Sequence, residues 1–325
     1  MSEKVYNVRK MTESGDEMTD LYQELDRGTV ERVLACPVCG APLGIAGEGR
    51  GLACSGDNPK GRAHCFDAGV SGYLPLAPRH SGGGDSKEAV RARSSFLRAD
   101  YYRPAAAALT QIVARYTPVG GTVLDAGCGE GYYSNHIAEA GYSVLGVDLS
   151  KFAVDAAAKA ARTSRLAAGK LSSRTVFAVG SVFELPVRSA SVDTVTNIFA
   201  PCAPTEYARV LRPGGYLIVA GAGERHLLDL KRLIYDDPYL NDGRSDLPKD
   251  GDAFTLVDQQ TVSFTARVEG QAHVAALFSM TPYYWRTSRV GHERLSQVER
   301  LETEVSFDFF IYRLSPHLNP NCFHH

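Results

Sequence analysis

Short apolar runs separated by helical spacing make up most of the chain after residue 104. The runs predict strands over residues 122–125, 143–148, 174–179, 194–198 and 216–220. The spacing between them predicts helices over residues 105–116, 132–140 and 151–161. Strands that alternate with helices form a mostly parallel sheet covered by those helices. The expected fold class is therefore α/β, with a Rossmann-like sheet.

The last third of the chain follows a different pattern. Residues 254–312 predict two strands, a helix and a strand. The runs that indicate these elements include residues 255–267, 271–278 and 305–313. Strands that arrive in succession suit an antiparallel edge on the parallel sheet.

The pattern also divides the chain into four parts. Residues 1–32 predict an N-terminal arm, and residues 33–76 predict a small loop-rich module that is too small to be stabilised by its own core. Residues 77–104 contain a Gly- and Ser-rich linker and a helix that Asp85 or Ser86 can cap. Residues 105–325 then form the main domain.

Composition narrows the function classes only slightly. The 325 residues are 44% hydrophobic with a net charge of −2, so the whole chain carries no basic signature of nucleic-acid binding. No apolar window is long enough for a membrane helix, and the first twenty residues lack the apolar centre of a signal peptide. We expect a cytoplasmic protein without a membrane partner.

A glycine-rich turn between a strand and a helix is the strongest chemical signal. It reads Asp-x-Gly-x-Gly-x-Gly, comprising Asp125, Gly127, Gly129 and Gly131. Glycines let the backbone turn sharply beside a ligand, and the helix N-terminus favours an anionic group. The next strand ends at Asp148, an acid that can accept both ribose hydroxyls of an adenosine.

Three details favour S-adenosylmethionine over a dinucleotide at this turn. The glycine spacing differs from Gly-x-Gly-x-x-Gly, no pyrophosphate has to fit, and a Pro-Gly-Gly turn at 213–215 precedes a late strand. Ser181 follows the third strand, where it can hydrogen-bond the adenine or serve only as a turn residue. A class I methyltransferase is the resulting interpretation.

Clustered cysteines in the 33–76 module indicate a structural zinc site. Cys36 and Cys39 form a Cys-x-x-Cys pair, whose thiolates lie on one tight turn. Cys54 supplies the third ligand, and either His64 or Cys65 the fourth. A redox Cys-x-x-Cys would need a thioredoxin-like strand-to-helix junction, which the pattern here lacks.

Taken together, these motifs resemble the 23S ribosomal RNA (guanine-N1-)-methyltransferases, which include macrolide-resistance members. The likeness covers roughly residues 34–313 and runs in the same order along the chain. Its pieces are the cysteine pair at 36–39, His-x-Phe-Asp at 64–67, Gly-Tyr at 72–73, Asp-Ser at 85–86, Arg-Ala-Arg at 91–93, Phe-Leu at 96–97, Tyr-x-Pro at 102–104, the glycine turn at 124–133, Ala-Pro-Cys at 200–202, the segments at 225–231 and 233–235, Met-Thr-Pro at 280–282 and Trp-Arg at 285–286.

The resemblance implies roles for particular residues. The family's cofactor contacts map onto Tyr102, Gly129, Glu130 and His226. The zinc module is implied to help recognise an rRNA hairpin, and the family suggests a homodimer.

This chain departs from the family in the module. The usual third and fourth ligands form Cys-x-x-x-His, whereas nine residues separate Cys54 from His64 here. Residues 55–63 are therefore an insertion beside the expected RNA surface. The arm at residues 1–32 is also longer than the family pattern.

The methyl acceptor is less well defined by the sequence. Asn197 and Phe199 follow the fourth strand, where Asn197 can hydrogen-bond the target base and Phe199 can stack on it. Equally, Asn197 can end the strand and Phe199 can belong to the core. A locally basic stretch at 79–103 can contact phosphates or form an ordinary solvated helix face.

Three functions remain open. The first is methylation of guanine N1 in 23S rRNA, with an antibiotic-resistance role. The second is methylation of a small molecule or peptide in natural-product biosynthesis, which the insertion and the net charge suit. The third is a non-catalytic zinc-containing RNA-binding protein, against which the intact glycine turn argues.

Overall fold

The structure, a computed structural model, describes residues 27–47, 50–56, 61–77, 83–168, 175–249 and 253–316. Most of the expected N-terminal arm (residues 1–26) and part of the expected insertion (residues 57–60) lie outside the described residues.

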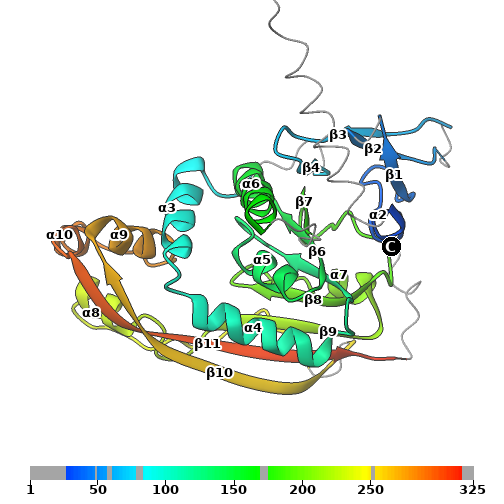
Figure 1. Cartoon of the computed structure of the whole chain (residues 1–325). Helices are drawn as coiled ribbons and strands as arrows, with labels where there is room; N and C mark the ends of the chain where they lie inside the picture. The colour runs from blue at the N-terminus through cyan, green and yellow to red at the C-terminus, as the bar shows by residue number, and fades with distance from the viewer. Residues whose placement is uncertain are drawn as a thin grey trace, which may run out of the picture.

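An eight-stranded sheet forms the centre of the molecule, in the order β10-β11-β9-β8-β5-β6-β7-β4 (Figure 1). Five of its parallel strands are β5 (Thr122–Ala126), β6 (Ser143–Asp148), β7 (Thr175–Val179), β8 (Val192–Ile198) and β9 (Leu211–Ala222). The chain proceeds from β5 outward through β6 to β7, and then returns to place β8 on the other side of β5. Such a switch in direction opens a crevice at the carboxyl ends of the central strands.

Alternation of side chains along the strands determines which helices cover each face. Val123 and Val144 point to one face, where they pack with α4 (Arg103–Tyr116) and α5 (Tyr132–Glu139). Leu124 and Leu145 point to the opposite face, where α7 (Pro204–Val210) contributes Tyr207 and Val210 to the core. Helix α6 (Lys151–Ala168) packs Val154 and Ala157 against Phe177 of β7.

Two long antiparallel strands complete the sheet beyond β9. Strand β11 (Arg300–Leu314) pairs with β9, and β10 (Phe254–Glu269) pairs with β11 at the sheet's edge. The expected mostly parallel sheet with an antiparallel edge is therefore confirmed.

The order of elements in the last third differs from the prediction of two strands, a helix and a strand. Between β10 and β11 lie two helices, α9 (Gln271–Ser279) and α10 (Arg289–Ser296), near α8 (Leu228–Ile234). Six of the nine residues of α9 are apolar and they do not gather on one face, so spacing alone assigned it poorly, and the turn at Gly270 (φ +85°) ends β10.

The cysteine-rich module is a three-stranded antiparallel sheet with one further strand. Its strands are β1 (Leu43–Ala46), β2 (Gly51–Cys54) and β3 (Cys65–Asp67), in the order β1-β2-β3. The two-residue strand β4 (Leu74–Pro75) then leaves the module and pairs with β7 in the large sheet.

The module and the large sheet share one hydrophobic core. Helix α2 (Arg27–Val33) and Leu34 pack with Leu43 and Leu52 of the module, and the same cluster continues to Leu145 and Val176 of the sheet. Leu34 also forms a backbone bridge with Val187, and the N–H of Ala35 donates to Pro186 O. The module is thus fixed to the sheet by both packing and backbone hydrogen bonds.

Helix α3 (Lys87–Arg98) connects the module to the main sheet, standing between α6 and α9 (Figure 1). Ser86 caps it, as expected, by accepting a hydrogen bond from Ala89 N at 3.2 Å. Within the described residues, no helix is long and apolar enough to span a membrane.

We predict that the shared core makes unfolding of the module and the sheet one event. Leu34→Ala removes a 2% exposed side chain from that core, so it should lower the free energy of unfolding by about 2–5 kcal/mol. Urea unfolding followed by circular dichroism and by tyrosine fluorescence should give one coincident transition. The matched control is Val119→Ala at a fully exposed position, and two separate transitions would contradict the prediction.

Candidate active site

The glycine turn lies at the carboxyl end of β5, inside the crevice between β5 and β8. Gly127 has a φ of +82°, and an added Cβ there would lie 2.3 Å from Ala200 Cβ, so only glycine fits against the loop after β8. The buried Asp125 accepts hydrogen bonds from Ser134 of α5 and, at 3.0 Å, from Thr196 of β8. Burial raises the pKa of Asp125 to about 6.

Asp148 at the end of β6 holds the other side of the turn. Its carboxylate accepts from Gly129 N at 3.0 Å and from Ser150 N at 2.8 Å. Burial raises the pKa of Asp148, and these two backbone donors oppose that rise. The acid predicted to bind a ribose therefore sits directly beside the glycine turn.

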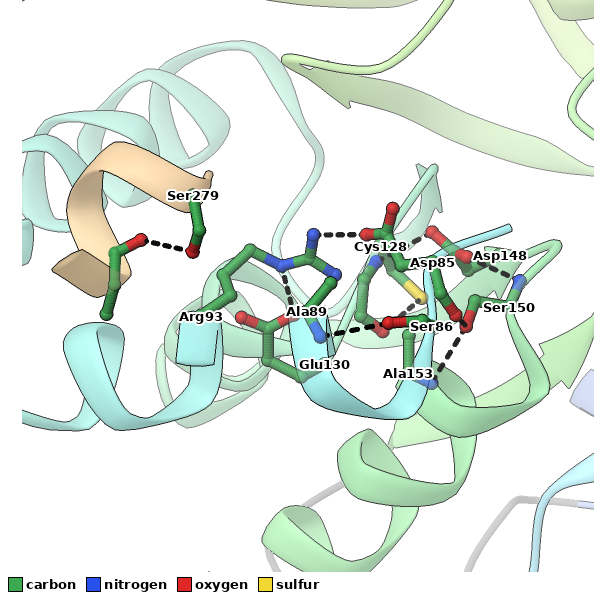
Figure 2. Close-up of polar contacts among 12 residues, drawn as sticks. Asp85, Ser86, Ala89, Arg93, Cys128, Glu130, Asp148, Ser150, Ala153 and Ser279 are labelled. Atoms are coloured by element: carbon green, nitrogen blue, oxygen red, sulfur yellow. Dashed lines mark hydrogen bonds and ion pairs between the residues drawn. The ribbon is translucent and has the colours of Figure 1, made fainter. Parts of the chain in front are cut away.

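Arg93 of α3 forms two ion pairs beside this turn (Figure 2). Arg93 Nε donates to Glu130 Oε2 at 2.6 Å, and Arg93 Nη1 donates to Asp85. Glu130 is buried, and its other oxygen, Oε1, has no hydrogen-bond partner among the described residues. Desolvation of the Glu130 carboxylate raises its pKa, although the Arg93 guanidinium counteracts that rise.

Aromatic rings line the crevice next to the turn. Tyr102, Phe199 and His226 each contact Phe307, with ring centroids 5.5, 4.9 and 5.6 Å away. His226 Nδ1 accepts a hydrogen bond from Ser306 N at 3.2 Å, so its proton resides on Nε2. Burial lowers the pKa of His226 to about 4, which keeps the ring neutral at physiological pH.

The two residues predicted to meet the acceptor are placed differently. Phe199 is 47% exposed and adopts a φ of +53°, an unusual conformation that turns its ring out of the strand. Asn197 is fully buried, and its Nδ2 donates to Ala126 O, Pro201 O and Tyr207 Oη. Asn197 therefore fixes the loop that carries Phe199, while no described residue donates to its own Oδ1.

Ser181 lies in the turn after β7. Its hydroxyl accepts from Phe183 N at 3.2 Å, which is the bond of a local serine turn. Its predicted contact with the adenine stays a prediction, as do the substrate and cofactor contacts of the other site residues.

Sequence reasoning missed a loop that closes the crevice behind His226. The buried Lys231 donates to Tyr239 O and to Asn241 Oδ1, both at 2.8 Å. Asn241 Nδ2 in turn donates to Gly223 O and to His226 O. The available signal was a lysine among the apolar residues of a short helix, where an unpaired charge would be costly.

Arg244 fastens the same loop to two strand ends. Its guanidinium donates to Ala220 O at 3.0 Å and to Ala200 O at 2.7 Å, and it pairs with Asp246. Asp246 accepts from Cys202 N at 2.9 Å. The loop thereby sets the spacing between the ends of β8 and β9. Phe199 follows the end of β8, and His226 follows the end of β9.

Four side chains of the module converge outside this crevice. Ligand atoms of Cys36, Cys39, Cys54 and His64 all lie within 4.8 Å of one another. His64 Nδ1 is 3.6 Å from Cys36 Sγ and 3.5 Å from Cys54 Sγ. Cys65, the alternative fourth ligand, is exposed and lies outside the cluster.

Comparison with known proteins adds to this geometry. A methyltransferase domain family matches residues 124–219, which span β5 to β9. The chain is 33% identical over 210 residues to the 23S rRNA (guanine(748)-N(1))-methyltransferase of Streptomyces fradiae, covering 63% of this chain and 68% of that one. It is 35% identical over 216 residues to a Micromonospora griseorubida protein named for 23S rRNA (guanine-N(1)-)-methylation, covering 61% and 68%. A Bacillus subtilis protein named for the same reaction is 24% identical over 287 residues, covering 85% and 95%.

The site fits the methyl donor of this family. Among the described residues, the buried oxygens Glu130 Oε1 and Asn197 Oδ1 beside the turn are acceptors without donors. The predicted use of S-adenosylmethionine is confirmed at the level of the family. The chain is an S-adenosylmethionine-dependent methyltransferase, and it belongs to the family of 23S rRNA (guanine-N1-)-methyltransferases.

Proposed function

We propose that the enzyme methylates N1 of a guanine in 23S rRNA. The observation that carries this proposal is that two relatives named for that reaction are 33–35% identical to this chain over 210–216 residues, and a third covers 85% of it. A methyltransferase acting on a small molecule would have no evident need for the module. RNA is accordingly the proposed partner.

The exposed ring of Phe199 suits an acceptor that is a base. Aromatic side chains recognise unstacked RNA bases by stacking on them, and Phe199 is held outward by its backbone conformation. His226 and Phe307 support the ring from behind. Methyl transfer needs the nucleophile, methyl group and sulfur in line, so positioning of the base supplies much of the rate.

A neutral His226 is compatible with a cationic sulfonium nearby. A protonated imidazole would repel the positive sulfur, whereas the π face of the neutral ring would not. We therefore assign His226 to the cofactor side of the crevice, with Phe199 on the acceptor side.

We further propose that Cys36, Cys39, Cys54 and His64 hold a structural zinc ion. Three thiolates and one imidazole form a common tetrahedral zinc set, and four protein ligands leave no position for catalysis. His64 N donates to Cys54 Sγ at 3.1 Å, which is the kind of outer contact that orients a ligand. The ion would stabilise the module that shares its core with the large sheet.

Stacking by Phe199 gives a test of the acceptor. Phe199→Ala should lower kcat/KM for 23S rRNA by roughly 5- to 100-fold, as expected from the loss of one base–aromatic stack, without changing the affinity for S-adenosylhomocysteine. The measurement is transfer of labelled methyl to rRNA from a host without this modification, with mass mapping of the product.

Phe152→Ala is the matched control, since Phe152 is 49% exposed but lies on α6. Failure of the wild-type enzyme to label any guanine N1, together with labelling of a small molecule or peptide, would replace rRNA by that alternative acceptor.

The zinc site predicts one metal ion per chain in purified protein. His64→Ala and Cys54→Ser should each lower the zinc content measured by atomic emission, because each removes one of four ligands. Cys65→Ser should retain the zinc, since Cys65 is exposed and outside the cluster. Loss of zinc from Cys65→Ser with retention in His64→Ala would reverse the assignment of the fourth ligand.

The buried His226 predicts a pH dependence of stability. Its folded pKa is about 4 and its unfolded pKa about 6.5, so between these values only the unfolded chain binds the proton. This contribution should lower the free energy of unfolding as the pH falls from about 6.5 to 4, by up to about 3 kcal/mol.

Urea unfolding of wild type and His226→Gln at pH 7.5 and 5 isolates this contribution from Asp125, whose raised pKa acts in the opposite direction. The wild type should lose more stability than the variant on acidification. Equal losses would show that His226 is not buried in its neutral form.

A further inference from the structure

Arg93 is the cation of an otherwise acidic site. Around the glycine turn lie the carboxylates of Asp125, Glu130 and Asp148, and the segment before α3 adds Asp85. Arg93 pairs with two of these four acids, with its side chain 23% exposed (Figure 2). The guanidinium is thus held rigidly in place rather than free in solvent.

The segment that carries this arginine is itself anchored beside the ribose acid. Ser150 Oγ donates to Asp85 O at 2.8 Å, and an added Cβ at Gly84 would lie 2.7 Å from the backbone of Ser150. Residues 84–93 therefore run from the turn after Asp148 to the turn that contains Gly129. They pass over both loops that a methyl donor must contact.

One edge of the Arg93 guanidinium is unused. Nε and Nη1 are taken by Glu130 and Asp85, whereas Nη2 makes no hydrogen bond to any described residue. Nη2 lies over Gly129, because an added Cβ at that glycine would be 3.4 Å from it. Gly129 has a φ of +54° and shortly precedes α5, whose N-terminus favours anions.

The other half of the ion pair also has an unused atom. Glu130 is only 8% exposed, and its Oε1 has no partner in the part of the chain that the structure describes, although a buried carboxylate oxygen normally accepts a hydrogen bond. The pair thus offers one cationic donor and one anionic acceptor side by side. An α-amino acid, which carries an anion and a cationic donor close together, satisfies both.

We propose that Arg93 is a cofactor-binding residue whose Nη2 binds the α-carboxylate of S-adenosylmethionine, while Glu130 Oε1 accepts from its α-ammonium group. The resemblance implied Glu130 as a contact, but nothing in the sequence assigned Arg93. This inference rests on the use of S-adenosylmethionine by the family. It makes α3, which leads out of the cysteine-rich module, part of the cofactor site.

The amino-acid end of the ligand provides a direct test by calorimetry. S-adenosylhomocysteine contains that end, whereas 5′-methylthioadenosine has the same adenosine and sulfur without it. Arg93→Ala should raise the Kd of S-adenosylhomocysteine by about 10- to 100-fold, the value of one charge-assisted hydrogen bond. The Kd of 5′-methylthioadenosine should change by less than about twofold.

Two further variants complete the experiment. Arg91→Ala, an exposed arginine on the same helix, should leave both affinities unchanged. Arg93→Lys, which keeps the charge but loses the planar fork, should bind S-adenosylhomocysteine with intermediate affinity. Thermal melts of each variant would show whether the fold is retained.

Two results would overturn the role of Arg93: an unchanged Kd for S-adenosylhomocysteine in Arg93→Ala, or an equal loss of affinity for both ligands, which would mean a structural role. If the wild-type protein bound neither ligand, the cofactor assignment itself would fail, and that result is distinct from either of the other two.

Discussion

The hydrogen bonds of the buried Asp125 carboxylate are the constraint on which the rest of the site depends. That carboxylate joins β5 to the first turn of α5 through Ser134 and to β8 through Thr196. The glycine turn is therefore clamped between two strands before any ligand is present. Asp148 and the loop after β8, which carries Phe199, both contact this turn.

Much of this arrangement was predictable from the sequence because its causes are local. Buried parallel strands need continuous apolar runs, and the positive φ at Gly127 needs a glycine, so strand positions and the turn are visible in the residue order. The antiparallel edge of the large sheet was predictable for a similar reason. The Cys-x-x-Cys pair was equally local, since two thiolates three residues apart share one turn.

Other features depend on contacts between distant segments, and no local pattern encodes them. Whether His64 or Cys65 joins the cysteines depends on which neighbour points inward, and adjacent residues near a strand face opposite ways. The sequence placed Arg93 in a basic stretch that could contact phosphates or form a solvated helix face, and its ion pair with Glu130 depends on how α3 packs against the glycine turn. The loop tied down by Lys231 and Asn241 gave no periodic signal, because its order comes from side chains that bond to backbone carbonyls.

The two-residue strand β4 has a consequence for where this chain can be divided. It is the outermost strand beside β7, and the module's apolar side chains cover Leu145 and Val176. A fragment starting at the sequence-based boundary near residue 105 would uncover the edge of a parallel strand and an apolar surface together. Uncovered strand edges recruit other chains. By covering that strand edge and that apolar surface, the small module opposes self-association of the large sheet, in addition to its proposed part in recognition.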